Sequence, residues 1–302
     1  MASATSNITA PSRLRTYASF VRFEHTLFSL PLILAGVFTV RGPSLSLARW
    51  LLVAVAAVGA RTAGMSLNRL IDRHIDARNP RTVVRELPAG RMKLAEGFAL
   101  LLVSTAAYLA ACTALGPWYL KLSMVPLVVF TVYPYLKRFT PFCHFGVGAA
   151  LALAPLAGYA AGHPDMADPW PALWLAAFAL FWVSGFDIIY ATLDEEFDRS
   201  NGIHSMVAWL GRPPALRISW GLHLIAIAAL AKAYWILSFR PGPAAWSAWV
   251  LPLPFFVTVV VLLYLEQKWA EDVNLAFFRT NVWVGFAVLL MVLSARLGNG
   301  GF

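Results

Sequence analysis

Residues 48–76 read ARWLLVAVAAVGARTAGMSLNRLIDRHID, an apolar run that ends in the motif Asn68-x3-Asp72-x3-Asp76. The apolar part has the length of about 20 residues that a membrane-spanning helix needs. The whole chain has the same character, with 59% hydrophobic and 13% charged residues, whereas soluble domains average about 25% charged residues. The sequence therefore predicts an all-α, polytopic membrane helical bundle without a large soluble domain.

Nine apolar segments of spanning length follow one another along the chain, and several contain Pro or Gly. We expect residues 1–20 to be a disordered cytoplasmic N-terminus and residues 21–302 to form a single transmembrane domain. The two cysteines, Cys112 and Cys143, lie in apolar stretches and predict neither a disulfide nor a zinc framework. The predicted spans are 21–40, 48–68, 95–113, 117–136, 144–162, 171–191, 215–237, 245–265 and 277–297.

A second acidic segment, DIIYATLDEEFD at residues 187–198, ends the sixth predicted span. Its Asp194 and Asp198 repeat the i,i+4 spacing of Asp72 and Asp76 at an offset of 122 residues, from 72 to 194. Seven of the fifteen Asp and Glu lie in the two acidic segments, so this acid is not general solubilising charge. The repeat predicts two pseudo-repeated halves of four helices, followed by a ninth helix.

Most of the 24 Lys and Arg fall in alternate loops. Because Lys and Arg accumulate in cytoplasmic loops, this asymmetry places the N-terminus and both acidic segments on the cytoplasmic side. The loop at residues 162–170 has no Lys or Arg and is predicted to be external. Membrane anchoring explains the net charge of +9, and an anionic lipid or substrate is a better partner than nucleic acid.

Residues four apart share a helix face, and like charges at that spacing repel. Each acidic segment therefore predicts a stripe that needs cations. One solution is salt bridging by the arginines between positions 69 and 85. The other is Mg²⁺, which is typically held by one or two carboxylates together with substrate phosphates. Two facing stripes would hold two ions around one diphosphate, and basic side chains would bind the phosphates directly, namely Arg78, Arg81, Arg85 and Lys137.

The two acidic segments resemble the aspartate motifs of the UbiA-type intramembrane aromatic prenyltransferases. The second motif is then Tyr190-Ala-x2-Asp194-x3-Asp198. Tyr133-Pro134-x2-Lys137-Arg138, after the fourth predicted span, is also similar to a motif of that family. The resemblance covers almost the whole chain. One departure is Arg69, which stands where many members carry Asp directly after the Asn and leaves one ligand fewer in the first motif.

The resemblance implies a Mg²⁺-dependent enzyme that transfers a polyprenyl group from polyprenyl diphosphate to an aromatic acid. In such enzymes, Mg²⁺ and basic side chains stabilise the departing diphosphate, and an apolar bundle shields the allylic cation from water. The metal ligands are expected to be Asn68, Asp72, Asp76, Asp194 and Asp198.

The resemblance also implies roles near the acceptor. Arg138 is expected to bind the acceptor carboxylate, or else simply to anchor the membrane surface. Asp187 is expected to serve the acceptor or the proton loss, or else to form a hydrogen bond with Tyr190. The acceptor pocket is expected to contain Arg22, His25 and Tyr190, or else Arg22 and His25 simply cap the membrane interface.

Bacterial members that act on small aromatic acids are the most similar, which predicts a protein of the bacterial inner membrane. We expect 4-hydroxybenzoate as the acceptor, in ubiquinone biosynthesis. The alternative is a dihydroxynaphthoate in the futalosine route to menaquinone. A different class, a secondary transporter with a carboxylate cation site, would also have repeats and buried acids, but transporter sites favour the membrane midplane and broken helices.

Overall fold

The computed structural model describes residues 12–22, 26–39, 45–164, 166–239, 246–270 and 273–300, without the side chains of residues 26–28 and 273–279. In this part of the chain the regular structure is entirely helical. The helices are α1 (Arg13–Phe20), α2 (Thr26–Val37), α3 (Leu47–Asp76), α4 (Leu94–Leu115), α5 (Pro117–Leu122), α6 (Met124–Leu136), α7 (Cys143–Gly162), α8 (Trp170–Ala191), α9 (Glu195–Ser200), α10 (Met206–Leu210), α11 (Arg212–Ser238), α12 (Ser247–Val250), α13 (Leu253–Lys268) and α14 (Val273–Gly298).

The predicted all-α membrane bundle is confirmed. Within the described residues, eight helical segments are long and apolar enough to cross a membrane, and they correspond to the second to ninth predicted spans. The first predicted span contains α2, whose 12 residues cover about 18 Å. Large apolar side chains such as Leu102 (68% exposed) and Val103 (67% exposed) face outwards, as lipid-facing residues do. The internal repeat stays a prediction.

The expected disorder of the N-terminus is wrong for residues 13–20, which form α1. The side chain of Ser12 caps this helix by accepting a hydrogen bond from the backbone N–H of Arg15. Tyr17 Oη then donates to Glu96 at the start of α4, at 2.9 Å, and Phe20 is fully buried. These contacts with distant residues give α1 a fixed place on the bundle.

The expectation of one continuous stripe from Asp187 to Asp198 is also wrong. Helix α8 ends at Ala191, and a 3-10 turn, Thr192–Asp194, separates it from α9. Asp187 therefore belongs to the straight part of α8, whereas Asp194 lies in the turn that redirects the chain. The second acidic segment can thus present its carboxylates in two directions.

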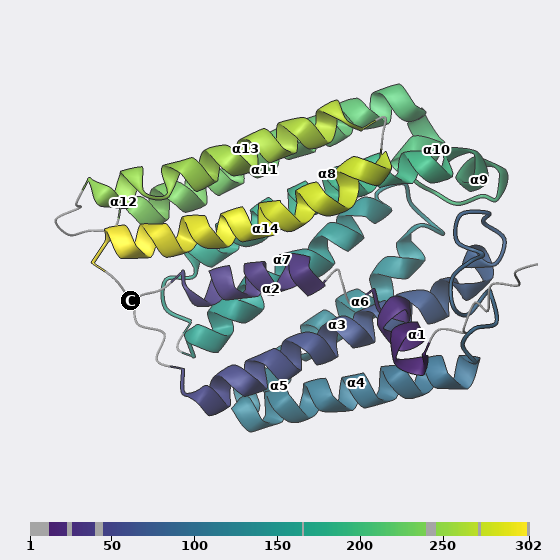
Figure 1. Cartoon of the computed structure of the whole chain (residues 1–302), viewed down its shortest axis with the longest axis horizontal. Helices are drawn as coiled ribbons and strands as arrows, with labels where there is room; N and C mark the ends of the chain where they lie inside the picture. The colour runs from purple at the N-terminus through teal and green to yellow at the C-terminus, as the bar shows by residue number, and fades with distance from the viewer. Residues whose placement is uncertain are drawn as a thin grey trace, which may run out of the picture.

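The length of α3 places the first acidic motif at one end of the bundle. Its 30 residues cover about 45 Å, more than the roughly 30 Å of a bilayer's hydrocarbon core. The last turns of α3 run toward the end of the molecule where α1, α9 and α10 also lie, on the right of Figure 1. Both acidic motifs are therefore at the same end.

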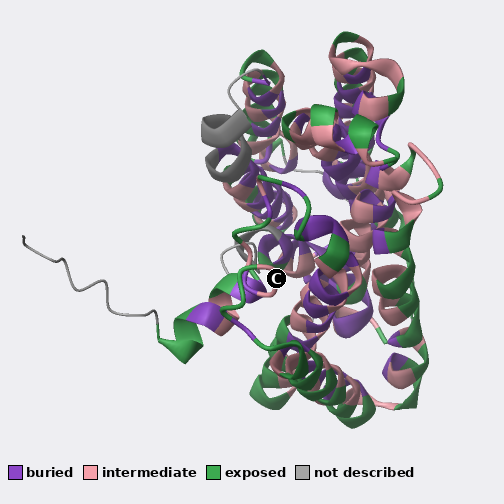
Figure 2. Ribbon diagram, turned by 90° about the vertical axis from the view of Figure 1, so that its right-hand side faces the viewer, coloured by how far each residue is buried: buried purple, intermediate pink, exposed green. Residues whose placement is uncertain are grey.

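The main apolar core lies around α8, which packs against α7 and α11. Phe178 and Trp182 of α8 are fully buried there, and in Figure 2 buried residues line the inner faces of the helices. Helix α2 crosses α7 closely, since a Cβ at Gly158 would lie 1.8 Å from the carbonyl oxygen of Ile33. Small residues allow such close approach of membrane helices. A cavity lies on the other side of α7 and α8, between these helices and α3 and α4.

Candidate active site

Asp72, near the end of α3, is buried (1% exposed) among polar partners. Its Oδ2 accepts hydrogen bonds from Asn68 Nδ2 at 3.1 Å and from Lys137 Nζ at 2.6 Å. Arg138 Nη2 lies 3.4 Å from the other oxygen, Oδ1, which accepts no hydrogen bond from the described residues. One oxygen of Asp72 is therefore saturated, and the other is buried but still able to accept a ligand.

Asp76, one turn further along α3, is paired with two arginines. Arg85 Nη1 donates to both carboxylate oxygens at 2.7 and 2.8 Å, and Arg69 Nη1 lies 4.0 Å from Oδ2. Arg69 is buried, and its Nε donates to the carbonyl oxygen of Phe20 at 3.3 Å. Arg69, the departure from the family motif, is thus a buried cation that ties α1 to the first motif.

Asp194 of the second motif faces the loop that follows α3. Asn79 Nδ2 and Arg81 Nε each donate to Asp194 Oδ1 at 2.8 Å, and Arg81 Nη2 pairs with Oδ2. Arg81 Nη1 donates to Tyr190 Oη at 2.6 Å, and the guanidinium carbon lies 4.6 Å from the centre of that ring. Burial alone would lower the pKa of Arg81, but the hydrogen bonds and charge interactions with Asp194 and Tyr190 together outweigh burial and raise the pKa. Arg81 therefore stays charged.

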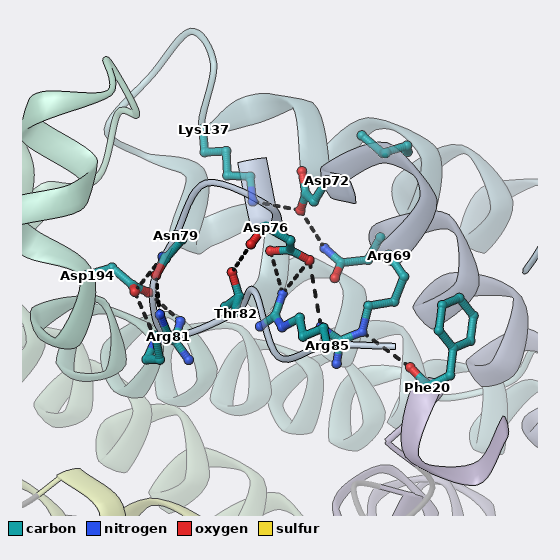
Figure 3. A network of polar contacts seen from close by, with 12 residues as sticks. Phe20, Arg69, Asp72, Asp76, Asn79, Arg81, Thr82, Arg85, Lys137 and Asp194 are labelled. Atoms are coloured by element: carbon teal, nitrogen blue, oxygen red, sulfur yellow. Dashed lines mark hydrogen bonds and ion pairs between the residues drawn. The ribbon is translucent and has the colours of Figure 1, made fainter. Parts of the chain in front are cut away.

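The loop at residues 77–93 links the two motifs through its cations. Thr82 Oγ1 donates to the carbonyl oxygen of Asp76 at 3.1 Å, and Asn79 Oδ1 accepts from the backbone N–H of Arg81 at 2.8 Å. These local bonds fold the loop so that Arg85 reaches the first motif and Arg81 reaches the second (Figure 3). The salt bridges predicted as one solution are therefore present.

A cavity of about 970 Å³ extends into the bundle from Asn68 of the first motif and Tyr190 of the second. Its lining on α3 runs from Val53 to Arg69, which is about 24 Å of helix. Apolar residues of α3, α4, α6, α7 and α8 form most of the wall, and the charged end includes Arg85. Ligand pockets of this kind combine an apolar wall with a few placed polar groups. The shape suits a substrate that has an anionic head and a long apolar tail.

Arg61 lines the same cavity, seven residues before Asn68 on α3. Its Nε is buried and has no hydrogen-bond partner, and none of the described residues forms a salt bridge with it. An arginine inside a membrane span is costly unless it is partnered, so this cation is a candidate for binding a small anion. Arg61 was not among the residues expected from the sequence. The sequence could have indicated it, because a spacing of seven residues is close to two helical turns and places Arg61 on the same helix face as Asn68.

Asp187 of α8 lines the cavity, as does Tyr190 one turn later. Its Oδ2 lies 2.7 Å from Nδ1 of His144, a buried residue at the start of α7. His144 Nε2 accepts a hydrogen bond from the backbone N–H of Met206 at 3.2 Å. The partner of Asp187 is therefore His144 and not Tyr190. His144 carries no spacing signal in the sequence, because it meets Asp187 only across the contact of two helices.

The remaining residues expected near the acceptor have different positions. Arg138 donates to the carbonyl oxygens of Pro134 and Ile71 at 2.9 and 3.0 Å, and among the described residues it is not part of the cavity lining. Arg22 lines the cavity and has a positive φ of 48°. His25 lies outside the described residues. Arg78 is exposed and forms no salt bridge with a described carboxylate.

The donor set of the two motifs has the chemistry that a hard cation prefers, since carboxylate and amide oxygens are typical Mg²⁺ ligands. The buried Oδ1 of Asp72, which accepts no hydrogen bond from the described residues, is an oxygen that such an ion could use. In the described part of the chain, however, no three His, Cys, Asp or Glu side chains converge as a metal cage. Basic side chains lie against the carboxylates instead. A divalent cation would therefore be shared between these carboxylates and a bound anion.

The fold and site define an integral membrane protein whose helices enclose a long apolar cavity with paired basic and acidic side chains at one end. A model of the UbiA prenyltransferase family matches residues 29–294, and the chain belongs to this family. The protein is therefore a prenyltransferase.

Curated relatives and solved structures agree with this assignment. A 4-hydroxybenzoate octaprenyltransferase of Vibrio campbellii is 27% identical, over 94% of this chain and 98% of the relative. One of Coxiella burnetii is 30% identical, over 78% of this chain and 80% of the relative. The apo structure of a UbiA homolog from Aeropyrum pernix K1 matches with a TM-score of 0.77 and 32% identity, over 88% of this chain and 95% of that one. A UbiA homolog from Archaeoglobus fulgidus bound to GPP and Mg²⁺ shares the fold, with a TM-score of 0.67 and 19% identity over 91% of this chain and 99% of that one.

Proposed function

We propose that this protein transfers a polyprenyl group from polyprenyl diphosphate to the ring of 4-hydroxybenzoate, a step of quinone biosynthesis. The observation that carries the proposal is Arg61, which lines the apolar cavity about 10 Å along α3 from Asn68 and forms no salt bridge with the described residues. A prenyl tail has no need of a cation, whereas an aromatic carboxylate does. The names of the relatives from Vibrio and Coxiella support the choice of acceptor.

The diphosphate end is built from the two motifs and their cations. We assign Arg81, Arg85 and Lys137 to the diphosphate oxygens, since guanidinium and ammonium groups form charge-assisted hydrogen bonds with phosphate. Mg²⁺, which the Archaeoglobus relative binds together with GPP, would neutralise charge on the diphosphate and favour its departure. The residues that would hold it are Asn68, Asp72, Asp76, Asp194 and Asp198. Arg78 is a further, exposed candidate for the phosphates.

The acceptor lies between Arg61 and the diphosphate end. The carboxylate and the hydroxyl are at opposite ends of 4-hydroxybenzoate, so a carboxylate anchored on Arg61 directs the hydroxyl and its neighbouring ring carbons toward Asn68 and Asp187. Holding donor and acceptor in line removes much of the entropic barrier to their reaction. This assignment gives the carboxylate to Arg61 instead of Arg138, which lies against Asp72 and positions that carboxylate. Arg22 and Tyr190 complete the pocket around the acceptor.

The protein's residues have separate tasks during transfer. The cations and carboxylates at the motif end stabilise the diphosphate as the carbon–oxygen bond to the prenyl group breaks. The apolar wall keeps water away from the allylic cation that results. The ring carbon beside the hydroxyl then attacks this cation, and the ring proton is lost. The tail remains in the cavity throughout, which explains why the cavity is longer than the reacting groups require.

We place the N-terminus and this site on the cytoplasmic side of a bacterial inner membrane, because the loop at residues 77–93 carries a high density of Lys and Arg. Both motifs lie at helix ends, where a water-soluble aromatic acid can enter. A secondary transporter is not supported, since its ion site would lie near the midplane.

The test is product formation. Membranes that contain the protein receive Mg²⁺, a polyprenyl diphosphate and one aromatic acid at a time, and lipid products are identified by mass spectrometry. The proposal expects prenylated 4-hydroxybenzoate, and much less product with 4-hydroxybenzamide, which has the same ring but no carboxylate. Prenylation of a dihydroxynaphthoate alone would overturn the acceptor assignment. Cation-dependent solute uptake without any prenylated product would overturn the proposal as a whole.

A further inference from the structure

Asp187 differs from the other acids of the site in its partner. Among the described residues it is the only carboxylate that lines the cavity. Asp72, Asp76 and Asp194 are all paired with Lys or Arg, whereas the one described partner that pairs with Asp187 is His144, at 2.7 Å. Its side chain is 25% exposed, whereas that of His144 is 2% exposed. The carboxylate thus faces the cavity, with the imidazole behind it.

The second contact of His144 fixes which ring nitrogen carries the proton. The backbone N–H of Met206 can only donate, so Nε2, 3.2 Å away, must be unprotonated and accept. The single ring proton is then on Nδ1, where it is donated to Asp187 Oδ2. His144 is therefore neutral in this arrangement. It orients the carboxylate without cancelling its negative charge, as a paired Lys or Arg would.

The surroundings hold the imidazole in place. Ser184 Oγ, on α8, lies 3.3 Å from the carbonyl oxygen of His144. One turn along α7, a Cβ at Gly148 would lie 2.4 Å from the carbonyl oxygen of Leu180, so the two helices are in close contact beside the pair. Met206 begins α10, which Ser205 caps. His144 is thus fixed from two directions and leaves Asp187 one oxygen, Oδ1, for the cavity.

We propose that His144 is a positioning residue that aims Asp187 at the acceptor ring, and that Asp187 is the base that removes the ring proton. The inference rests on the proposed function, because it needs an aromatic acceptor. In the step, the new carbon–carbon bond has formed and the diphosphate has left with the electron pair of the broken carbon–oxygen bond. Asp187 Oδ1 takes the proton from the substituted ring carbon, and the electrons of that carbon–hydrogen bond return to the ring. The carboxylic acid then loses its proton to water.

Three substitutions test this inference in membranes that contain the full-length protein. His144→Gln keeps an amide that can donate to Asp187 and accept from Met206, but it cannot become a cation. His144→Leu removes both hydrogen bonds at similar volume. Asp187→Asn is isosteric and removes only the base. His223→Leu is the matched control, because His223 is also fully buried and hydrogen-bonded but does not line the cavity.

The readout is the turnover rate with ordinary 4-hydroxybenzoate and with its 3,5-dideuterated form. Both rates come from the same membranes, so their ratio does not depend on how much protein has folded. We expect no isotope effect in the original protein, where loss of the ring proton is fast. A misaimed base slows this step by as much as about 100-fold, so an isotope effect should appear in His144→Leu. It should stay absent in His144→Gln and in His223→Leu, and Asp187→Asn should lower turnover by about 10²- to 10⁴-fold.

The outcomes separate the inference from the proposed function. Failure of the original protein to prenylate any aromatic acid would refute the proposed function. Prenylation by the original protein, together with full activity of Asp187→Asn, would refute the base. A slower His144→Leu without an isotope effect would mean that His144 does not act on the proton step. A His144→Gln variant as impaired as His144→Leu would show that a titrating imidazole is required, which contradicts a neutral positioning role.

Discussion

Replacing Arg61 by Leu should change acceptor binding and protein stability in opposite senses. A charge-assisted hydrogen bond contributes about 1.5–3 kcal/mol, and each 1.4 kcal/mol corresponds to about a tenfold change in affinity. The KM for 4-hydroxybenzoate should therefore rise by about 10- to 100-fold. Stability should increase, because the buried Nε of Arg61 has no hydrogen-bond partner among the described residues. A central Arg-to-Leu exchange in a membrane helix favours insertion into the membrane by up to about 4 kcal/mol, and the open cavity beside Arg61 makes this an upper limit.

The assay is steady-state turnover in nanodiscs against acceptor concentration and, separately, against donor concentration, together with a thermal unfolding scan. Donor KM should stay within about twofold, since the cations that we assign to the diphosphate are paired with the motif carboxylates and not with Arg61. Arg49→Leu is the matched control on the same helix, because Arg49 bonds Tyr119 and does not line the cavity. An unchanged acceptor KM in Arg61→Leu, or a rise in donor KM alone, would refute the assignment of the carboxylate to Arg61.

Three further outcomes follow from the same geometry. Arg81→Lys removes the two-point contact with Asp194 and the stacking on Tyr190, so donor KM should rise while acceptor KM stays constant; a constant donor KM would argue against Arg81 as a diphosphate ligand. Ala60→Trp narrows the cavity that Ala60 lines, so turnover of long prenyl diphosphates should fall more than that of short ones. An equal loss for both would mean that the prenyl tail binds outside this cavity. Chelation of divalent cations should stop transfer and added Mg²⁺ should restore it; transfer that persists in excess chelator would contradict a metal-assisted departure of diphosphate.

The membrane spans could be predicted because the length and polarity of an apolar run are local properties of the sequence. The formation of an ordered helix α1 could not be predicted, since it depends on contacts such as Tyr17 with Glu96 and Ser19 with Glu86, which join residues far apart in the chain. The break after Ala191 was hidden for a related reason. The i,i+4 spacing of acids is compatible with a continuous helix, and only the packing at the end of α8 decides between the two.

The acidic motifs could be predicted because charge within an apolar chain needs compensation. Which cation meets which carboxylate could not, since this depends on the path of the loop at residues 77–93. Arg81 reaches Asp194 and Arg85 reaches Asp76 only because that loop folds back over the motifs. The pairing of Asp187 with a histidine was equally inaccessible. In contrast, Arg61 could have been found from its helical register alone.

The central claim is that the two acidic motifs act together on one diphosphate, and a double-mutant cycle tests it most directly. The measured quantity is kcat/KM for prenyl transfer by Asp72→Asn, by Asp194→Asn and by the double variant. Loss of one group that stabilises a transition state costs about 10²- to 10³-fold, and groups that act as a unit have strongly non-additive effects. We predict that the double variant is impaired about as much as either single variant. A loss equal to the product of the two single losses would contradict the claim, because the motifs would then act at independent sites.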